Sequence, residues 1–148
     1  MLQNLMTLKR PPRVPRTARN VMMNLLARRD HSEKEMRKKL REREFTDAEI
    51  EKAILFGRER DWLPSDAETA GKLAEKMAQG LHRKGKGIIY INHFLKEKGL
   101  PPLRPDSDLE VEKAKLCLQN KKSPDRAKLG RFLLSRGFQL DVIRKVLK

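Results

Sequence analysis

The sequence has few of the residues from which catalytic and metal sites are commonly built. It contains one cysteine, Cys117, which excludes an intramolecular disulfide and fits a reducing compartment. Its histidines, His31, His82 and His93, fall in different predicted elements without the spacing of metal ligands. One tryptophan, one tyrosine and five phenylalanines are too few for an extended surface that stacks single-stranded bases. We therefore expect a protein without catalytic activity, metal or other cofactor.

Long apolar runs and strand patterns are also scarce. No window approaches the apolar length that a helix needs to cross a membrane. The N-terminal residues carry their charges after the apolar positions, which is the reverse of a secretory signal. GIIYI, residues 87–91, is the one β-branched run, and Leu95 follows it at helical spacing. We expect an all-α, cytoplasmic protein that does not bind membranes.

Positive charge is abundant. Thirty-five Lys and Arg residues face twenty Asp and Glu residues, so the net charge is +15. Such an excess repels itself and favours binding to a polyanion or to an acidic protein surface. Single- and double-stranded DNA are the expected partners, with an affinity that falls as salt rises. The alternative is a solvated basic surface that has no such partner.

Amphipathic helices are predicted from residue 18 onward. Residues 1–17 contain three prolines and no acidic residue, and we expect them to form a basic tail. Capping-box pairs predict where four of the helices begin. These pairs are Ser32 with Glu35, Thr46 with Glu49, Ser65 with Glu68, and Ser107 with Glu110. His31, beside the first of these caps, is expected to face water.

A small helical unit recurs along the chain. Leu40, Phe45 and Ile50 recur 93 residues later as Leu133, Phe138 and Ile143. An intermediate copy places Leu95 and Gly99 at an offset of 55 residues from Leu40 and Glu44. The last copy follows the middle one by only 38 residues, so the third helix of the middle copy is expected to be reduced to the segment PPLRPDS. The pattern predicts three related copies, the middle one shortened.

The stretch RKGKG, residues 83–87, falls at the turn between the first two helices of the middle copy. It is not a dinucleotide-binding fingerprint, because no strand precedes it and Tyr90 stands in the place of the third glycine. No Gly-Lys-Ser or Gly-Lys-Thr follows, which excludes a Walker loop. Its lysines lie beside the exposed amides of a helix start. The stretch is either a solvated turn or a place where a phosphate or carboxylate docks.

Five segments, taken in order, carry a family signature. They are LLARRDHSEKEMRKKL (25–40), EFTDAEIEKAI (44–54), DWL (61–63), RKGKGIIYINHFLKEKGL (83–100) and RFLLSRGFQLDVI (131–143). Together they resemble the RecX family, bacterial regulators of the RecA recombinase. The resemblance extends over residues 18–148. Thr69 stands where the family usually has an aromatic residue, and Tyr90 and Phe94 stand where Arg and Glu are frequent.

This resemblance implies an elongated array of three tandem three-helix units. We place the units at residues 18–63, 64–105 and 106–148, after the tail at 1–17. It also implies a monomeric, non-enzymatic protein that binds in the groove of the RecA–DNA filament. There it would mainly inhibit filament growth, ATP hydrolysis and strand exchange during DNA recombination and repair. A free-standing nucleic-acid-binding module is the alternative function, and an adaptor for another acidic protein is a third.

The candidate binding residues are cations at the end of each first helix and on the last unit. They are Arg28, Arg29, Arg83, Lys84, Lys86, Lys121, Lys122, Lys128, Arg131 and Arg136. If the units stack regularly, the cations at equivalent positions form a basic stripe. Cations at a helix C-terminus also stabilise the helix dipole, by roughly 0.3–1 kcal/mol each, and this alternative explains one or two per copy.

Overall fold

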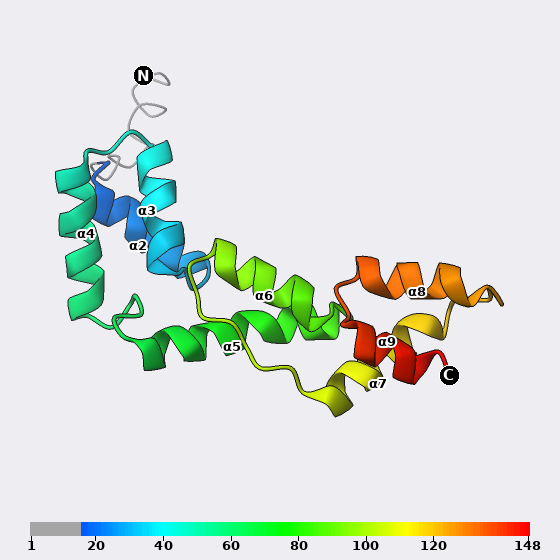
Figure 1. The fold of residues 1–148 in the computed structure, drawn as a ribbon. Coiled ribbons are helices and arrows are strands. Elements are labelled where there is room, and N and C mark those ends of the chain that lie inside the picture. The colour runs from blue at the N-terminus through cyan, green and yellow to red at the C-terminus, as the bar shows by residue number, and fades with distance from the viewer. Residues whose placement is uncertain (1–15) are drawn as a thin grey trace, which may run out of the picture.

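The structure is a computed structural model that describes residues 16–148, so nearly all of the predicted basic tail lies outside the described residues. This part of the chain is all-helical and extends as an elongated array from the first unit to the last (Figure 1). The helices are α2 (Ala18–Arg28), α3 (Glu33–Glu42), α4 (Asp47–Glu59), α5 (Ala67–Arg83), α6 (Ile88–Glu97), α7 (Ser107–Leu118), α8 (Arg126–Ser135) and α9 (Leu140–Val146). The prediction of an all-α array is confirmed.

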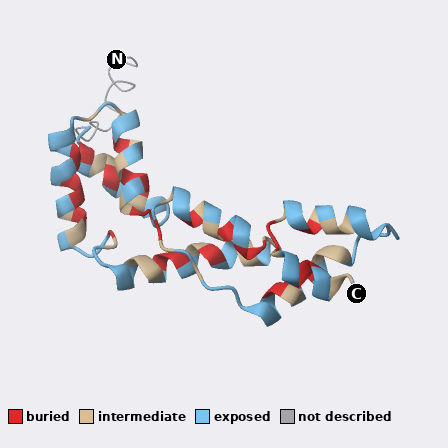
Figure 2. Ribbon diagram, viewed as in Figure 1, coloured by how far each residue is buried: buried red, intermediate tan, exposed pale blue. Residues whose placement is uncertain are grey.

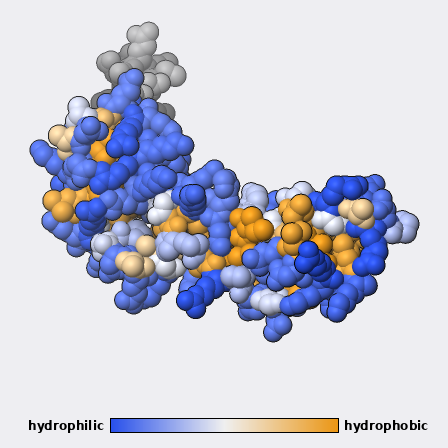
Figure 3. All heavy atoms as spheres, in the orientation of Figure 1, coloured by the Kyte–Doolittle hydropathy of each residue, from blue (hydrophilic) through white to orange (hydrophobic). Residues whose placement is uncertain are grey.

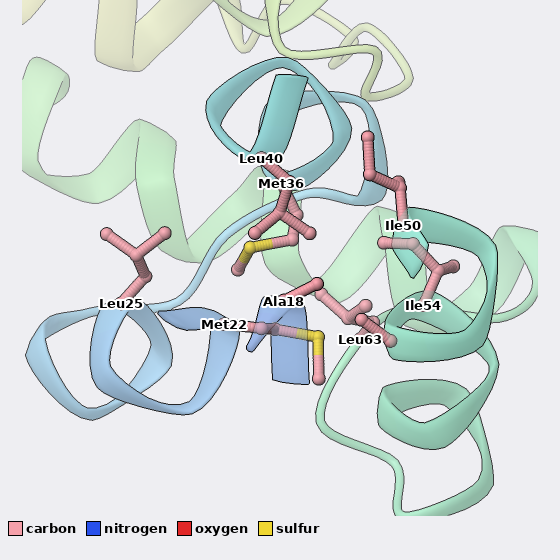
Figure 4. Packing of buried hydrophobic residues seen from close by; sticks show 9 residues of the cluster. Ala18, Met22, Leu25, Met36, Leu40, Ile50, Ile54 and Leu63 are labelled. Atoms are coloured by element: carbon pink, nitrogen blue, oxygen red, sulfur yellow. The ribbon is translucent and has the colours of Figure 1, made fainter. Parts of the chain in front are cut away.

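Three separate hydrophobic cores stabilise the units of the array, and their buried residues lie on the inward faces of neighbouring helices (Figure 2). The first core joins α2, α3 and α4, where Met22, Met36 and Ile54 are fully buried and point toward one another (Figure 4). Leu63 belongs to this core as well, at 2% exposure. The loop after α4 therefore closes the first unit on itself.

The second core is smaller because it is built from two helices. Leu73 and Ala78 of α5 pack with Ile91 and Leu95 of α6. The third helix is absent from residues 98–106, as predicted, and an extended segment takes its place. Asn92 fastens that segment: its Nδ2 donates to the carbonyl of Leu103 at 3.0 Å, and its Oδ1 accepts from the Leu103 amide at 2.8 Å. These two hydrogen bonds from the Asn92 side chain replace part of the packing that a third helix would provide.

The third core returns to three helices. Ala114 of α7, Leu133 of α8, and Val142 of α9 are buried together with Phe138, which lies in the turn between α8 and α9. Each core thus belongs to one helical unit, as the repeat predicts. The residue boundaries of the units stay a prediction.

Equivalent positions of the repeat adopt the same backbone. Glu44, Gly99 and Gly137 each follow a second helix and have φ of 66°, 73° and 93°, the left-handed region. After each of them the next amide donates back into the helix, to the carbonyls of Leu40, Leu95 and Leu133 at 3.3, 2.9 and 3.2 Å. This is a left-handed C-terminal cap, for which glycine is the usual residue. The register derived from the sequence is therefore present in the backbone.

Two of the predicted helix starts are confirmed, in whole or in part. Thr46 and Glu49 make the complete capping box. Ser32 accepts from the amide of Glu35 at 3.1 Å, but the Glu35 carboxylate binds elsewhere instead of completing a box.

Two other predicted helix starts are wrong. Asp66 with Thr69, not Ser65 with Glu68, caps α5, and Asp106 rather than Ser107 caps α7. A carboxylate one residue away from each predicted serine accepts from the first free amides instead.

Within residues 16–148, no helix combines the length and apolar character required to span a membrane. In the view of Figure 3 the surface is largely hydrophilic, and apolar atoms gather where α6 meets the third unit. That boundary is also where several of the predicted binding residues lie.

Candidate nucleic-acid interface

Adjacent units meet through one repeated contact. The N-terminal cap of α3 is Ser32, whose hydroxyl donates to the carbonyl of Lys98 after α6. The N-terminal cap of α6 is Gly87, whose amide donates to the carbonyl of Arg136 after α8 at 2.8 Å. Ser32 and Gly87 are equivalent in the repeat, and so are Lys98 and Arg136. The turn that ends one second helix therefore docks on the start of the preceding second helix. We call the contact at Ser32 the first joint and the contact at Gly87 the second joint.

The glycines of RKGKG are required by this contact. A Cβ on Gly87 would lie 2.3 Å from the carbonyl carbon of Gly137, so only glycine lets the two backbones meet. Gly85 has φ of 75°, which other residues rarely adopt. The amide of Ile89 adds a second backbone hydrogen bond, to Gly137, at 3.0 Å. The stretch is thus a structural joint, and the amides of Gly87 and Ile89 are occupied by protein carbonyls.

The first joint is reinforced by a buried carboxylate. Glu35 is 6% exposed and receives Arg29 at 2.6 Å and Lys98 at 2.5 Å. Burial alone would raise the pKa of Glu35, but the hydrogen bonds from Arg29 and Lys98 outweigh it and lower the pKa to about 2. Arg29 therefore neutralises a buried acid, although its side chain is still partly exposed. Lys98 was not among the residues predicted from the sequence to make a contact.

His31 lies in the same joint and is buried at 2% exposure, so the expectation that it faces water is wrong. Its Nδ1 donates to the carbonyl of Arg29 at 2.9 Å, and its Nε2 lies 3.3 Å from the Lys39 ammonium. Burial lowers the pKa of His31. The imidazole is therefore neutral at pH 7, and its buried ring packs inside the turn between α2 and α3.

The second joint contains a buried ammonium. Lys113 of α7, at 4% exposure, donates to the carbonyl of Lys86 and to Nδ1 of His82, both at 2.8 Å. Its Nζ lies 2.7 Å from Oε2 of Glu110, which is 2% exposed. Neither Glu110 oxygen accepts a well-oriented hydrogen bond from the described residues, so charge attraction holds this pair. The network ties α7 to the end of α5.

A pocket of about 310 Å³ opens beside this network, between the end of α5, the end of α7 and α8. Arg83, Lys84 and Arg136 contribute cations to its lining, and Phe132 contributes an aromatic ring. The Nζ of Lys121 lies 4.2 Å from the centre of that ring. None of the pocket-lining residues is acidic. We call this cavity the joint pocket.

The predicted binding cations divide into groups. Eight of the ten are exposed, and Lys86 and Arg136 are half-buried. Arg83, Lys84 and Arg136 are brought together in the joint pocket, with Lys121 over its ring. Lys122, Lys128 and Arg131 lie exposed in the third unit, and Arg28 lies at the end of α2 in the first. Whether any of them contacts nucleic acid stays a prediction.

Besides Arg29, which pairs with Glu35, two of these cations also serve the fold. Arg136 donates through Nε to the carbonyl of Gly85 at 3.3 Å, and through a second nitrogen to that of Lys84. The Nζ of Lys86 lies 4.5 Å from the centre of the Tyr90 ring. Sequence reasoning missed Lys113 and Lys98 altogether. The repeat register held a signal for Lys98, since it aligns with Arg136, and both precede the glycine that ends a second helix.

The chain is similar to proteins of one family along most of its length. Residues 18–56 match the first three-helix domain of RecX, and residues 118–147 match the third. Regulatory protein RecX of Actinobacillus pleuropneumoniae serotype 5b is 32% identical, over 84% of this chain and 87% of the relative. The Cronobacter sakazakii protein of the same name is 33% identical, over 84% and 86%.

Solved structures show the same fold. A crystal structure of RecX from Lactobacillus salivarius superposes with a TM-score of 0.69, covering 88% of this chain and 92% of that one, at 24% identity. A second crystal structure of a regulatory protein RecX gives 0.63 over 87% of this chain and 69% of the other, at 21% identity. The two matched domains lie at the two ends of the array, on either side of the shortened unit. With relatives above 30% identity that cover more than four-fifths of its length, this chain belongs to the RecX family of regulatory proteins.

Proposed function

We propose that this chain regulates a RecA recombinase by binding in the groove of the RecA–DNA filament, where it restrains filament growth, ATP hydrolysis and strand exchange. The observation that carries the proposal is the similarity to proteins named Regulatory protein RecX, which extends over 84% of the chain. The regulation is non-enzymatic in this proposal. The chain acts by occupying a surface and changing how the recombinase assembles.

The shape of the molecule supports this mode of action. Three units follow one another in an elongated array, so the chain can reach several protomers of a spiral filament together with the DNA inside it (Figure 1). Many contacts of moderate strength then act as one multivalent grip. The net charge of +15 attracts the chain to a polyanionic assembly and makes the affinity sensitive to salt.

DNA-dependent ATP hydrolysis by the cognate recombinase is the readout that tests the proposal. The rate should fall when this protein is added at a sub-stoichiometric ratio to the recombinase, because one array contacts several protomers. Circular dichroism confirms that the added protein is folded, and the salt concentration is kept low. An unchanged rate under these conditions would contradict the proposal.

A charge-reversal pair shows whether the last unit takes part. Lys128 and Arg131 are exposed on α8 and form no ion pair with any described residue. Lys128→Glu combined with Arg131→Glu should weaken the inhibition of ATP hydrolysis. The matched control reverses Lys38 and Lys52, which are exposed in the first unit and outside the predicted set. It lowers the net charge equally, so equal loss in both variants would mean that only net charge matters.

The second candidate function is a free-standing nucleic-acid-binding module, which the net charge and the cationic joint pocket favour. The two functions predict different effects of a preformed filament on the retention of this protein by DNA. If recombinase already on single-stranded DNA increases the retention of this protein over bare DNA, the filament is the partner. If the recombinase does not increase the retention, the result favours the free-standing nucleic-acid-binding module.

A further inference from the structure

The joint pocket combines positive charge with an apolar wall. Its rim carries Arg83, Lys84 and Arg136, and its wall is formed by Leu116, Cys117 and Phe132. Leu116 is 55% exposed although it is a leucine, so the wall is open to a ligand. A volume of about 310 Å³ is at the lower end of the range for sites that hold small organic molecules. The size excludes a duplex and fits a small ligand.

The rim charge is not cancelled by the protein. Among residues 16–148, no carboxylate lies within ion-pair distance of Arg83, Lys84, Lys121 or Arg136. The Lys113 ammonium also faces this pocket, but Glu110 neutralises it at 2.7 Å. Three uncompensated cations, Arg83, Lys84 and Arg136, therefore line one concave surface, and a fourth, Lys121, lies over the Phe132 ring. Such a surface concentrates anions, and phosphate is an anion that both guanidinium and ammonium groups bind.

The guanidinium of Arg136 is held in place before any ligand arrives. Its hydrogen bonds to the carbonyls of Lys84 and Gly85 use two of its five N–H donors. The remaining donors have no hydrogen-bond acceptor among the described residues and stay available. Because the side chain is already ordered, little conformational entropy is lost when a phosphate binds. Arg83 and Lys84, both exposed, can then close on the same group.

The apolar wall makes the pocket more than an anion site. The Phe132 ring lies beneath the Lys121 ammonium at 4.2 Å and 5.9 Å from the guanidinium carbon of Arg136. A phosphate on the rim would leave whatever is attached to it against Phe132 and Leu116. Aromatic rings next to cations are how single nucleotides are commonly held, with the base on the ring and the phosphate on the charge.

We propose that the joint pocket binds one nucleoside phosphate, with the phosphate on Arg83, Lys84 and Arg136 and the nucleoside against Leu116 and Phe132. The nucleotide is either free or one unit of a single strand, since both present the same chemistry. The pocket lies between the second and third units, so the bound nucleotide bridges α5 to α8. This site needs no recombinase, and its test is independent of the function proposed above.

Cys117 supplies a built-in reporter. It is the chain's one cysteine, it lies in the wall of the pocket, and its Sγ is 3.4 Å from the carbonyl of Gly85. The rate of its alkylation by iodoacetamide, a neutral reagent, therefore measures whether this pocket is filled. Binding elsewhere on the basic surface leaves the rate unchanged.

The experiment compares four probes at low salt: adenosine 5′-monophosphate, pentathymidylate, adenosine and inorganic phosphate. At about ten times its dissociation constant, a ligand in the pocket should slow alkylation about tenfold. Protection by the monophosphate supports a free nucleotide, protection by the oligonucleotide supports a strand, and protection by both supports both sources. Adenosine and phosphate should each protect far less at the same concentration. If neither nucleotide protects Cys117, or if adenosine or phosphate protects as well as the monophosphate, the proposal is overturned.

Two variants locate the effect. Arg83→Glu combined with Lys84→Glu reverses exposed rim charges and leaves the backbone of the joint intact, so it should abolish protection. Lys115→Glu is the control, because Lys115 is exposed on α7 outside the pocket, and it should retain protection to within about twofold. Each rate is divided by that of the same variant without ligand. Equal loss of protection in both variants would overturn the assignment of the phosphate to the rim.

Discussion

The Nζ of Lys98 lies 2.5 Å from Oε2 of Glu35, and this pair joins the turn after α6 to the first turn of α3. Arg29 approaches the same carboxylate from the end of α2 at 2.6 Å. Two units and three segments therefore meet on one buried charge. The relationship explains why a shortened middle unit stays docked on the first, and it makes the docking dependent on pH.

Acid should weaken the first joint through Glu35. Its pKa is about 2 in the folded protein and 4.5 in an unfolded chain, so the folded state binds fewer protons between these values. The stabilisation is complete above about pH 4.5 and is lost as pH falls toward 2, a total of about 3 kcal/mol. Urea unfolding measured at intervals over this range should show the free energy of unfolding falling with pH.

The Glu35→Gln variant tests this assignment. It should be less stable than the parent at pH 7 and should lose less stability between pH 4.5 and 2. Glu59 is the matched control, because it is exposed and forms no ion pair with any described residue. Glu59→Gln should leave the pH dependence close to that of the parent. A Glu35→Gln variant with the parental pH dependence would show that other carboxylates control the acid transition.

Gly87→Ala should damage the second joint. The added Cβ would lie 2.3 Å from the backbone of Gly137, and backbone atoms cannot swing away as a flexible side chain can. We expect a loss of several kcal/mol, or undocking of the third unit. Gly80→Ala is the control, since a Cβ there meets nothing within 4 Å in the interior of α5, and it should stabilise by about 0.5–1 kcal/mol. Thermal unfolding of both variants measures these effects. Similar melting temperatures for the two variants would contradict the close approach of the Gly87 and Gly137 backbones.

Glu44→Gly should stabilise the first unit. Glu44 has φ of 66°, where the equivalent residues of the other units are Gly99 and Gly137. A side chain in the left-handed region costs roughly 1–2 kcal/mol, part of which glycine returns as greater freedom in the unfolded chain. We expect a net gain of about 0.5–1 kcal/mol in chemical unfolding. Lys38→Gly, at an exposed position in the interior of α3, should instead destabilise by about as much.

The repeat explains which features the sequence could predict. Leu40, Leu95 and Leu133 recur at matching places, and all three are fully buried, because helical spacing is a local property that each unit repeats. The shortened middle unit followed from the unequal offsets alone. The absence of strands in residues 16–148 is confirmed for the same reason. The elongated array, which the family resemblance implied, is confirmed as well (Figure 1).

Contacts between units were not predictable in the same way. Lys113 and Glu110 occupy positions that composition assigns to the surface, and both are buried because α7 docks on the end of α5. His31 is likewise buried, although its position beside a helix cap suggested the surface. The joint pocket exists only after docking, so the sequence could nominate Arg83, Lys84 and Arg136 as cations but could not place them together.

Removing the Lys113 ammonium should be costly because Glu110 would remain buried without it. Breaking a buried ion pair from one side costs about 3–5 kcal/mol, and we expect that loss for Lys113→Met in urea unfolding. Lys115→Met, on the exposed face of the same helix, should change stability by less than about 0.5 kcal/mol. Replacing both partners, with Glu110→Leu and Lys113→Met, should recover most of the loss, since an apolar pair of similar volume needs no charge. If Lys113→Met were as mild as Lys115→Met, the ammonium would have to be reaching water, contrary to its 4% exposure.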